Sequence, residues 1–119
     1  MSLDDLIAEV QRDLGAVISK PKLTEKLLAK PPFRFLHDIV TAVMEATGFA
    51  TGIFTAEELD GKSITDKAVK TSFLQKLIDH VSSTTGRAVD VRTGKILAGA
   101  EPENTNMLLL VRAEDSAAV

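Results

Sequence analysis

The chain has 119 residues, enough for one domain with a hydrophobic core of its own. Hydrophobic residues make up 45% and charged residues 26%, which excludes an intrinsically disordered chain, and no apolar run approaches the roughly 18 residues of a membrane-spanning helix. The absence of cysteine excludes disulfides and thiolate chemistry, and the net charge of −3 argues against nucleic acid as a partner.

The N-terminal residues predict one long amphipathic helix. Ser2 with Asp5 three residues later is a capping pattern, and the apolar residues from Leu3 to Ile18 recur at spacings of three and four. Gly15 weakens the helix, and Pro21 ends it because proline cannot continue a helical hydrogen-bond ladder.

Two further helices are predicted before residue 48. Thr24 is a candidate N-cap for a helical turn over residues 24–29, and Pro32 suits the first position of the helix that follows. That helix is predicted at residues 33–47, with Gly48 as its stop signal. Its apolar stripe is wide, so we expect it to lie at the centre of the fold.

The middle of the chain predicts a short helix and then the longest one. Thr55 and Glu58 form a second capping box, which opens a helix that ends before Asp60. The longest helix is predicted at residues 65–84, closed by Gly86. Three of its lysines are expected to point largely outward: Lys67, Lys70 and Lys76.

The C-terminal part is less regular in its pattern. Residues 88–97 fit either a small hairpin or irregular chain, and we favour irregular chain because an isolated hairpin is marginal. Pro102 opens a last helix, in which the five apolar residues 107–111 are expected to be buried. We expect one domain at residues 1–112 and a disordered tail at residues 113–119.

These elements predict an all-α bundle around a single core. The residues expected in that core are the apolar positions that repeat along the predicted helices. They are Leu6, Val10, Leu36, Val40, Val43, Phe73, Leu77, Ile78, Leu108 and Leu109.

No enzyme signature survives inspection. The sequence Gly61-Lys62-Ser63 resembles the end of a phosphate-binding loop, but Ala56 stands where that motif needs glycine. The pairs His37-Asp38 and Asp79-His80 place neighbours about 100° apart on a helix, so neither pair converges on one ion or substrate. We interpret both histidines as partly buried structural residues, and we predict no catalytic, cofactor-binding or metal-binding residue.

Positive charge is concentrated in two stretches. Residues 20–34 hold five cations against the single carboxylate of Glu25, a local net charge of +4, and residues 62–76 hold four lysines against Asp66. An ordinary solvated surface explains such lysines as well as a binding face does. A concentrated cationic surface would attract an anionic partner with salt-sensitive affinity. The cations of the first stretch are Lys20, Lys22, Lys26, Lys30 and Arg34.

Several long motifs resemble a known family. They are KLTEKLLAKPPFRFLHDI at residues 22–39, TGF at 47–49, KTSFLQKLI at 70–78 and ILAGAEPENTN at 96–106. In order and spacing they are similar to the N-terminal domain of the intraflagellar transport protein 54 family, the microtubule-interacting subunits of the ciliary transport B complex. The similarity extends to about Leu110, after which residues 112–119 depart from the family's continuing helix.

The resemblance implies a calponin-homology-like helical bundle that binds tubulin or microtubules and supports tubulin transport in cilia and flagella. It also implies a location at the cilium or flagellum, the basal body and the cytoplasm. A coiled coil that contacts other B-complex subunits follows this domain in the family and is absent from this chain. The expected tubulin contacts are the five cations of residues 20–34, with Lys67 and Lys70 as outlying members.

Two other interpretations of the cationic stretch stay open. The domain is alternatively an assembly module that docks on another transport-complex subunit, in which case the lysines are incidental. An exposed apolar patch would favour that alternative. A phosphoinositide-containing membrane surface is a third and less favoured partner, since it too attracts lysine clusters.

Overall fold

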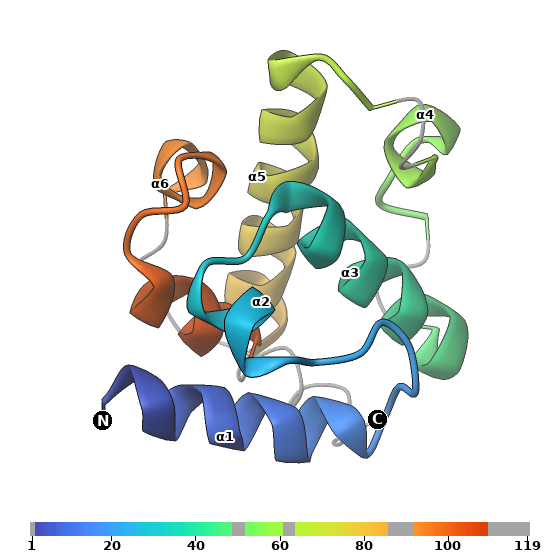
Figure 1. Cartoon of the computed structure of the whole chain (residues 1–119). Helices are drawn as coiled ribbons and strands as arrows, with labels where there is room; N and C mark the ends of the chain where they lie inside the picture. The colour runs from blue at the N-terminus through green and yellow to red at the C-terminus, as the bar shows by residue number, and fades with distance from the viewer. Residues whose placement is uncertain (1, 49–51, 61–63, 86–91, 110–119) are drawn as a thin grey trace.

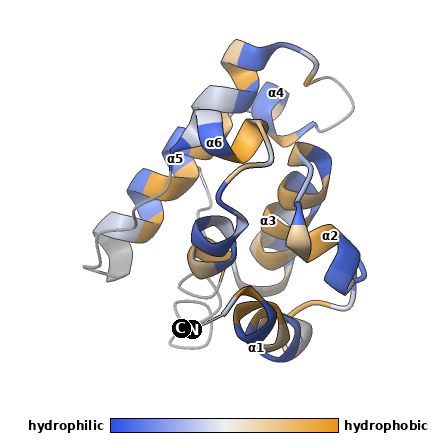
Figure 2. Cartoon of the chain, turned by 60° about the vertical axis from the view of Figure 1, so that its left-hand side comes forward, coloured by the Kyte–Doolittle hydropathy of each residue, from blue (hydrophilic) through white to orange (hydrophobic). Residues whose placement is uncertain are grey.

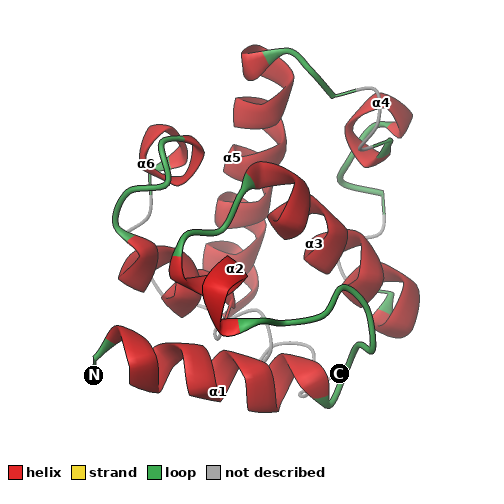
Figure 3. Cartoon of the chain, viewed as in Figure 1, coloured by secondary structure: helices red, strands yellow, loops and turns green. Residues whose placement is uncertain are grey.

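A computed structural model describes residues 2–48, 52–60, 64–85 and 92–109 (Figure 1). Within these ranges the chain is helical with connecting loops and has no strand (Figure 3), so the predicted all-α class is confirmed. Residues 102–109 form a helix after α6. The helices before it are α1 (Leu3–Gly15), α2 (Glu25–Ala29), α3 (Phe33–Thr47), α4 (Ala56–Leu59), α5 (Lys67–Thr85) and α6 (Thr93–Leu97).

The helices surround the long helix α5. In Figure 1, α1 runs across the bottom of the molecule and α5 rises upright from behind it. Helices α2 and α3 lie on the viewer's side, while the short helices α4 and α6 lie on opposite sides of α5. Hydrophobic and hydrophilic residues share each long helix (Figure 2), as expected of amphipathic helices that pack one face inward.

Local capping interactions explain where several helices begin. The Ser2 hydroxyl accepts a hydrogen bond from the Asp5 N–H at 3.2 Å, and the Thr24 hydroxyl accepts one from the Leu27 N–H at 3.2 Å. Both bonds satisfy an N–H group that has no partner inside its own helix. The predicted starts of α1 and α2 are therefore confirmed.

Helix α3 matches its predicted range at both ends. Gly48 adopts the left-handed conformation with φ of 76°, and its N–H donates to the Met44 carbonyl at 2.8 Å. Glycine adopts this conformation without a Cβ clash, which is why it stops the helix. At the other end the prediction was wrong in one detail, because Pro32 is the extended N-cap residue and not the first helical residue.

Three other predictions are corrected. The apolar pattern predicted a first helix that continues past Ile18 to Pro21, but α1 ends at Gly15. Ile18 is buried all the same, in the loop that follows the helix. Residues 93–97, expected to be irregular, form α6; residues 86–91 lie outside the described chain. Met107 is 42% exposed, so the expected burial fails there but holds at Leu108 and Leu109, while residues 110 and 111 lie outside the described chain. The expected tail, residues 113–119, also lies outside the described residues.

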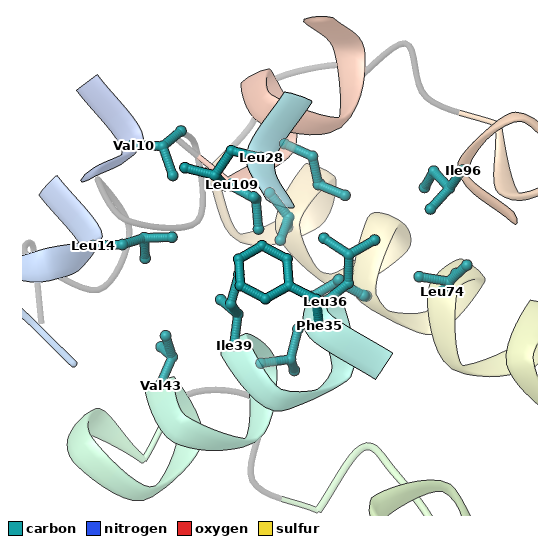
Figure 4. Packing of buried hydrophobic residues seen from close by; sticks show 14 of the residues in the cluster. Val10, Leu14, Leu28, Phe35, Leu36, Ile39, Val43, Leu74, Ile96 and Leu109 are labelled. Carbon is teal, nitrogen blue, oxygen red and sulfur yellow. The ribbon is translucent and has the colours of Figure 1, made fainter. Parts of the chain in front are cut away.

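One hydrophobic core joins all the long helices. All ten residues predicted to form it are buried in a single cluster. Figure 4 shows Val10 and Leu14 of α1, Phe35 of α3 and Leu74 of α5 directed toward this shared interior. The amide of Asn106, fully buried, donates to the Leu28 carbonyl at 2.8 Å and so ties the C-terminal helix to α2.

Candidate functional site

The five cations of residues 20–34, called here the basic segment, are all exposed to solvent. The segment begins in the loop after α1, continues through α2 and ends in the first turn of α3 (Figure 1). Leu28 is fully buried, and Leu23 and Leu27 pack against the core, so the apolar residues of the segment face inward. The charged positions between them are left in solvent. All five are exposed: Lys20, Lys22, Lys26, Lys30 and Arg34.

Most of this charge is not neutralised within the domain. Arg34 pairs with Asp38 one helical turn away, with 3.2 Å between Nε and Oδ1. Both side chains are largely in solvent, so the pair contributes little and does not hold Arg34 away from a partner. Among the described residues, none forms an ion pair with any of the four lysines of the basic segment.

Carboxylates lie near the Lys20 end of the basic segment. Lys20 borders a shallow hollow on α3 that Asp38 and Glu45 also line. These two carboxylates lower the local potential at that end. Lys22 and Lys26 are exposed and do not border that hollow, and the acid next to them on α2 is Glu25.

Lys30 lies at the end of α2, against the turn that follows α6. A Cβ placed on Gly99 would lie 2.7 Å from Cε and 3.1 Å from Cγ of Lys30. Gly99 has φ of 70°, a conformation that favours glycine, and it leaves room for the flexible stem of Lys30. The stem of Lys30 is therefore supported by the fold while the residue remains exposed.

Lys67 and Lys70 come from a different element, the first turn of α5. Lys67 is exposed, whereas Lys70 is half-buried with its Nζ 5.6 Å from the centre of the Phe33 ring. This distance is in the range of a cation–π contact. The two lysines line a hollow that begins at Pro32, so they meet the basic segment only at its C-terminal end.

Lys76, expected to point outward, instead pairs with a buried carboxylate. Glu58 is only 4% exposed, and its Oε1 lies 2.6 Å from Lys76 Nζ. The Ser72 hydroxyl donates to the other carboxylate oxygen at 3.0 Å, and the Thr55 N–H donates to Oε1 at 2.8 Å. The capping box was predicted from sequence; the burial of Glu58 was not, because its partners come from α5.

The surroundings of Glu58 lower the pKa of its carboxyl. Burial alone would raise that pKa, because desolvation disfavours the charged form. The hydrogen bonds from Lys76, the Thr55 N–H and Ser72, together with the positive charge of Lys76, outweigh burial and leave the pKa below its ordinary value. Glu58 is therefore an ionised group that, through Lys76, fastens α4 to α5.

His37 is more deeply placed than the sequence predicts. Its side chain is 2% exposed, and Nε2 lies 2.7 Å from the Glu58 carbonyl oxygen. Its ring centre is 4.8 Å from that of Phe73. His80 is half-buried on α5. The described residues contain no group of three His, Asp or Glu side chains that could hold a metal ion, and no described helix is long and apolar enough to cross a membrane.

Comparisons with known proteins agree with this architecture. Residues 6–118 match the family model described as the calponin-homology-like domain of the microtubule-binding protein MIP-T3. The chain is 49% identical over 104 residues to TRAF3-interacting protein 1 of Mus musculus, and 46% identical over 111 residues to that of Danio rerio. The alignments cover 87% and 93% of this chain but 17% and 18% of the relatives, so the chain spans less than a fifth of their length.

The match extends over nearly all of the chain, including the motifs at residues 22–39 and 96–106. The resemblance drawn from those motifs is confirmed. The chain belongs to the family of microtubule-binding protein MIP-T3 calponin-homology-like domains.

Proposed function

We propose that this domain binds microtubules or tubulin through the basic segment, with Lys67 and Lys70 as outlying contacts. The observation that carries the proposal is the exposure of all five cations in a domain whose family is described as microtubule-binding. The four lysines have no described acidic partner, so their charge is available to an external one.

The chemistry of the two surfaces is complementary. Tubulin presents acidic surface and glutamate-rich tails, and the basic segment presents lysines on a helical scaffold fixed by Leu28 and the core. Such charge complementarity steers encounter and adds affinity that salt weakens, because exposed charges are screened beyond about 8 Å at physiological ionic strength. No single lysine should dominate, since each exposed contact contributes only about 0.2–1 kcal/mol.

In the cell, we place this activity within an intraflagellar transport B-complex subunit that supports tubulin transport. The site of action would be the cilium or flagellum, the basal body and the cytoplasm. Contacts with other B-complex subunits would come mainly from the coiled coil that follows this domain in the family. Nothing in this role requires catalysis or a cofactor.

The alternative, docking on another transport-complex subunit, needs an exposed apolar surface. The large hydrophobic side chains that are exposed in the described part of the chain are Leu59 and Met107, at 38% and 42%. They lie on α4 and on the helix of residues 102–109, at separate places in Figure 1. Isolated exposed residues of this kind are ordinary, so these two side chains do not form an apolar docking surface.

Cosedimentation with microtubules tests the proposal, beside size-exclusion chromatography with free tubulin, each at low and high salt. We expect binding in at least one assay at low salt, and we expect it to weaken as salt rises. Binding to neither form of tubulin at low salt would contradict the proposal. Binding that does not respond to salt would favour an apolar contact instead.

A further inference from the structure

A second feature of the surface is a hollow of about 510 Å³. It lies between the start of α3, the start of α5 and the short helix α6. We call it the α3–α6 hollow. Its apolar lining comes from Pro32, Phe33, Leu97 and Ala98. Phe33 is half-buried and packs edge-on against Phe73 with 5.7 Å between ring centres, so its ring is held in place by the core. The hollow thus has a fixed hydrophobic wall.

Positive charge borders this hydrophobic wall. Lys67 and Lys70 line the α3–α6 hollow, and no carboxylate is among the described residues that line it. The contact between Lys70 and the Phe33 ring directs the ammonium group of Lys70 to this wall. Asp66, the neighbouring acid in the sequence, accepts a hydrogen bond from the Ala68 N–H at 2.8 Å. Its carboxylate is therefore engaged in starting α5.

We propose that the α3–α6 hollow binds an extended acidic segment of a protein partner. One apolar or aromatic side chain of that segment packs against Phe33 and Leu97, and carboxylates on either side of it pair with Lys67 and Lys70. The hollow adjoins the C-terminal end of the basic segment, and its Lys67 and Lys70 are also the outlying contacts of the proposed function. It does not require the partner of Lys20 to Arg34 to be tubulin, and the peptide assays below test it apart from microtubule binding.

The shape of the site selects this kind of ligand. A hollow of several hundred cubic ångströms takes an inserted side chain, and an aromatic anchor buried in a pocket supplies much of the affinity of many protein interfaces. A flat acidic surface would leave the hydrophobic wall unfilled. A neutral apolar peptide would leave the two lysines without partners, although water would still solvate them.

The test uses the 119-residue chain and two fluorescent synthetic peptides. The first carries three glutamates on each side of one phenylalanine, and in the second the phenylalanine is replaced by serine. Fluorescence anisotropy gives both affinities. We expect the serine peptide to bind at least about fivefold more weakly, because it keeps the charge and loses the anchor.

Two variants examine the hollow from the protein side. Gly94→Leu adds an apolar side chain at a lining position where a Cβ would meet no atom within 4 Å, so it narrows the hollow and keeps both lysines. The double variant Lys67→Glu with Lys70→Glu reverses the charge. Matched controls are Gly15→Leu, at another open glycine, and Arg12→Glu with Arg92→Glu, a charge-matched pair of exposed arginines outside both the hollow and the basic segment.

We expect both hollow variants to weaken binding of the phenylalanine peptide at least about fivefold, and both controls to change it less than about twofold. If the two charge-reversal pairs lose the same affinity for the phenylalanine peptide, the proposal is overturned, because the peptide is then attracted by the overall positive charge and not by the hollow. Full binding by Gly94→Leu, equal binding of the two peptides, or no binding to the wild-type chain would overturn it as well. If the reversal of Lys67 and Lys70 unfolds the domain, the serine peptide and Gly94→Leu still decide the question.

Discussion

Lys76 Nζ lies 2.6 Å from the Glu58 Oε1, and this ion pair joins two helices whose residues are 18 positions apart in the chain. Glu58 is buried, while the Lys76 side chain remains 35% exposed. The same carboxylate closes the capping box with Thr55. The carboxylate therefore serves two purposes, as the cap of α4 and as its attachment to α5.

The Glu58 ion pair predicts a specific dependence of stability on pH. The folded pKa of Glu58 lies below its ordinary value of 4.5, so its stabilising contribution is fully present above that value and is lost as pH falls through the folded pKa. Glu58→Gln should lower the free energy of unfolding by about 1–3 kcal/mol near pH 7. The substitution removes the negative charge of a buried carboxylate that accepts hydrogen bonds from Lys76, Ser72 and the Thr55 N–H. The difference from wild type should shrink below about pH 4.5. Urea unfolding of both proteins, measured from neutral pH to below about pH 4.5, checks this prediction.

The matched control is Glu57→Gln, which changes an exposed carboxylate on the same helix. It should alter the free energy of unfolding by less than about 0.5 kcal/mol at either pH. A Glu58→Gln effect that is the same at acid and neutral pH would mean that the ion pair does not contribute.

Phe73 is the aromatic centre of the core. It is fully buried and stacks on Phe54 with 4.5 Å between ring centres. Phe73→Ala should lower the free energy of unfolding by about 3–5 kcal/mol, because the hydrophobic contacts are lost and a cavity remains. Chemical denaturation measures the loss, and Leu59→Ala, at a partly exposed position, should cost far less. Near-equal losses would show that Phe73 is peripheral.

Two glycines at helix ends should respond in opposite directions to alanine. Gly48 has φ of 76°, so Gly48→Ala should destabilise by about 1 kcal/mol through strain in the left-handed conformation. Gly15 is the last residue of α1 and has open space around a Cβ, so Gly15→Ala should stabilise by about 0.5–1 kcal/mol. Thermal melting of both variants beside wild type checks the pair. Shifts of the same sign would contradict the assigned backbone conformations.

His37 is expected to matter for stability and not for binding. His37→Gln should lower the free energy of unfolding by about 1–3 kcal/mol, because it disturbs a buried hydrogen bond to the Glu58 carbonyl. Microtubule binding by the folded variant should equal that of wild type, since the ring is 2% exposed. Loss of binding with the fold intact would assign His37 a functional role.

Features set by neighbouring residues were predictable from the sequence. The caps at Ser2, Thr24 and Thr55 and the glycine stop at Gly48 depend on contacts within four residues, and the structure has all four. The apolar periodicity likewise identified the core, because burial repeats with the helical period.

Features set by distant contacts were not predictable. The five-residue helix α6 is held by burial of Ile96 against the core, which its local sequence does not reveal. Burial of Asn106 depends on the Leu28 carbonyl, 78 positions away. For the candidate site, the sequence located the charges of the basic segment. It did not distinguish Lys76, which pairs internally, from Lys67, which stays in solvent.

The most direct test of the account is microtubule cosedimentation of a triple reversal, Lys22→Glu, Lys26→Glu and Lys30→Glu. The matched control reverses three exposed cations elsewhere, Arg12→Glu, Arg92→Glu and Lys95→Glu. We expect the first variant to bind at least about tenfold more weakly than wild type, because three contacts of about 0.2–1 kcal/mol are replaced by repulsion. The control should bind more strongly than that variant, and circular dichroism should show both folded. A folded triple reversal that binds like wild type would contradict the claim that the basic segment contacts the microtubule.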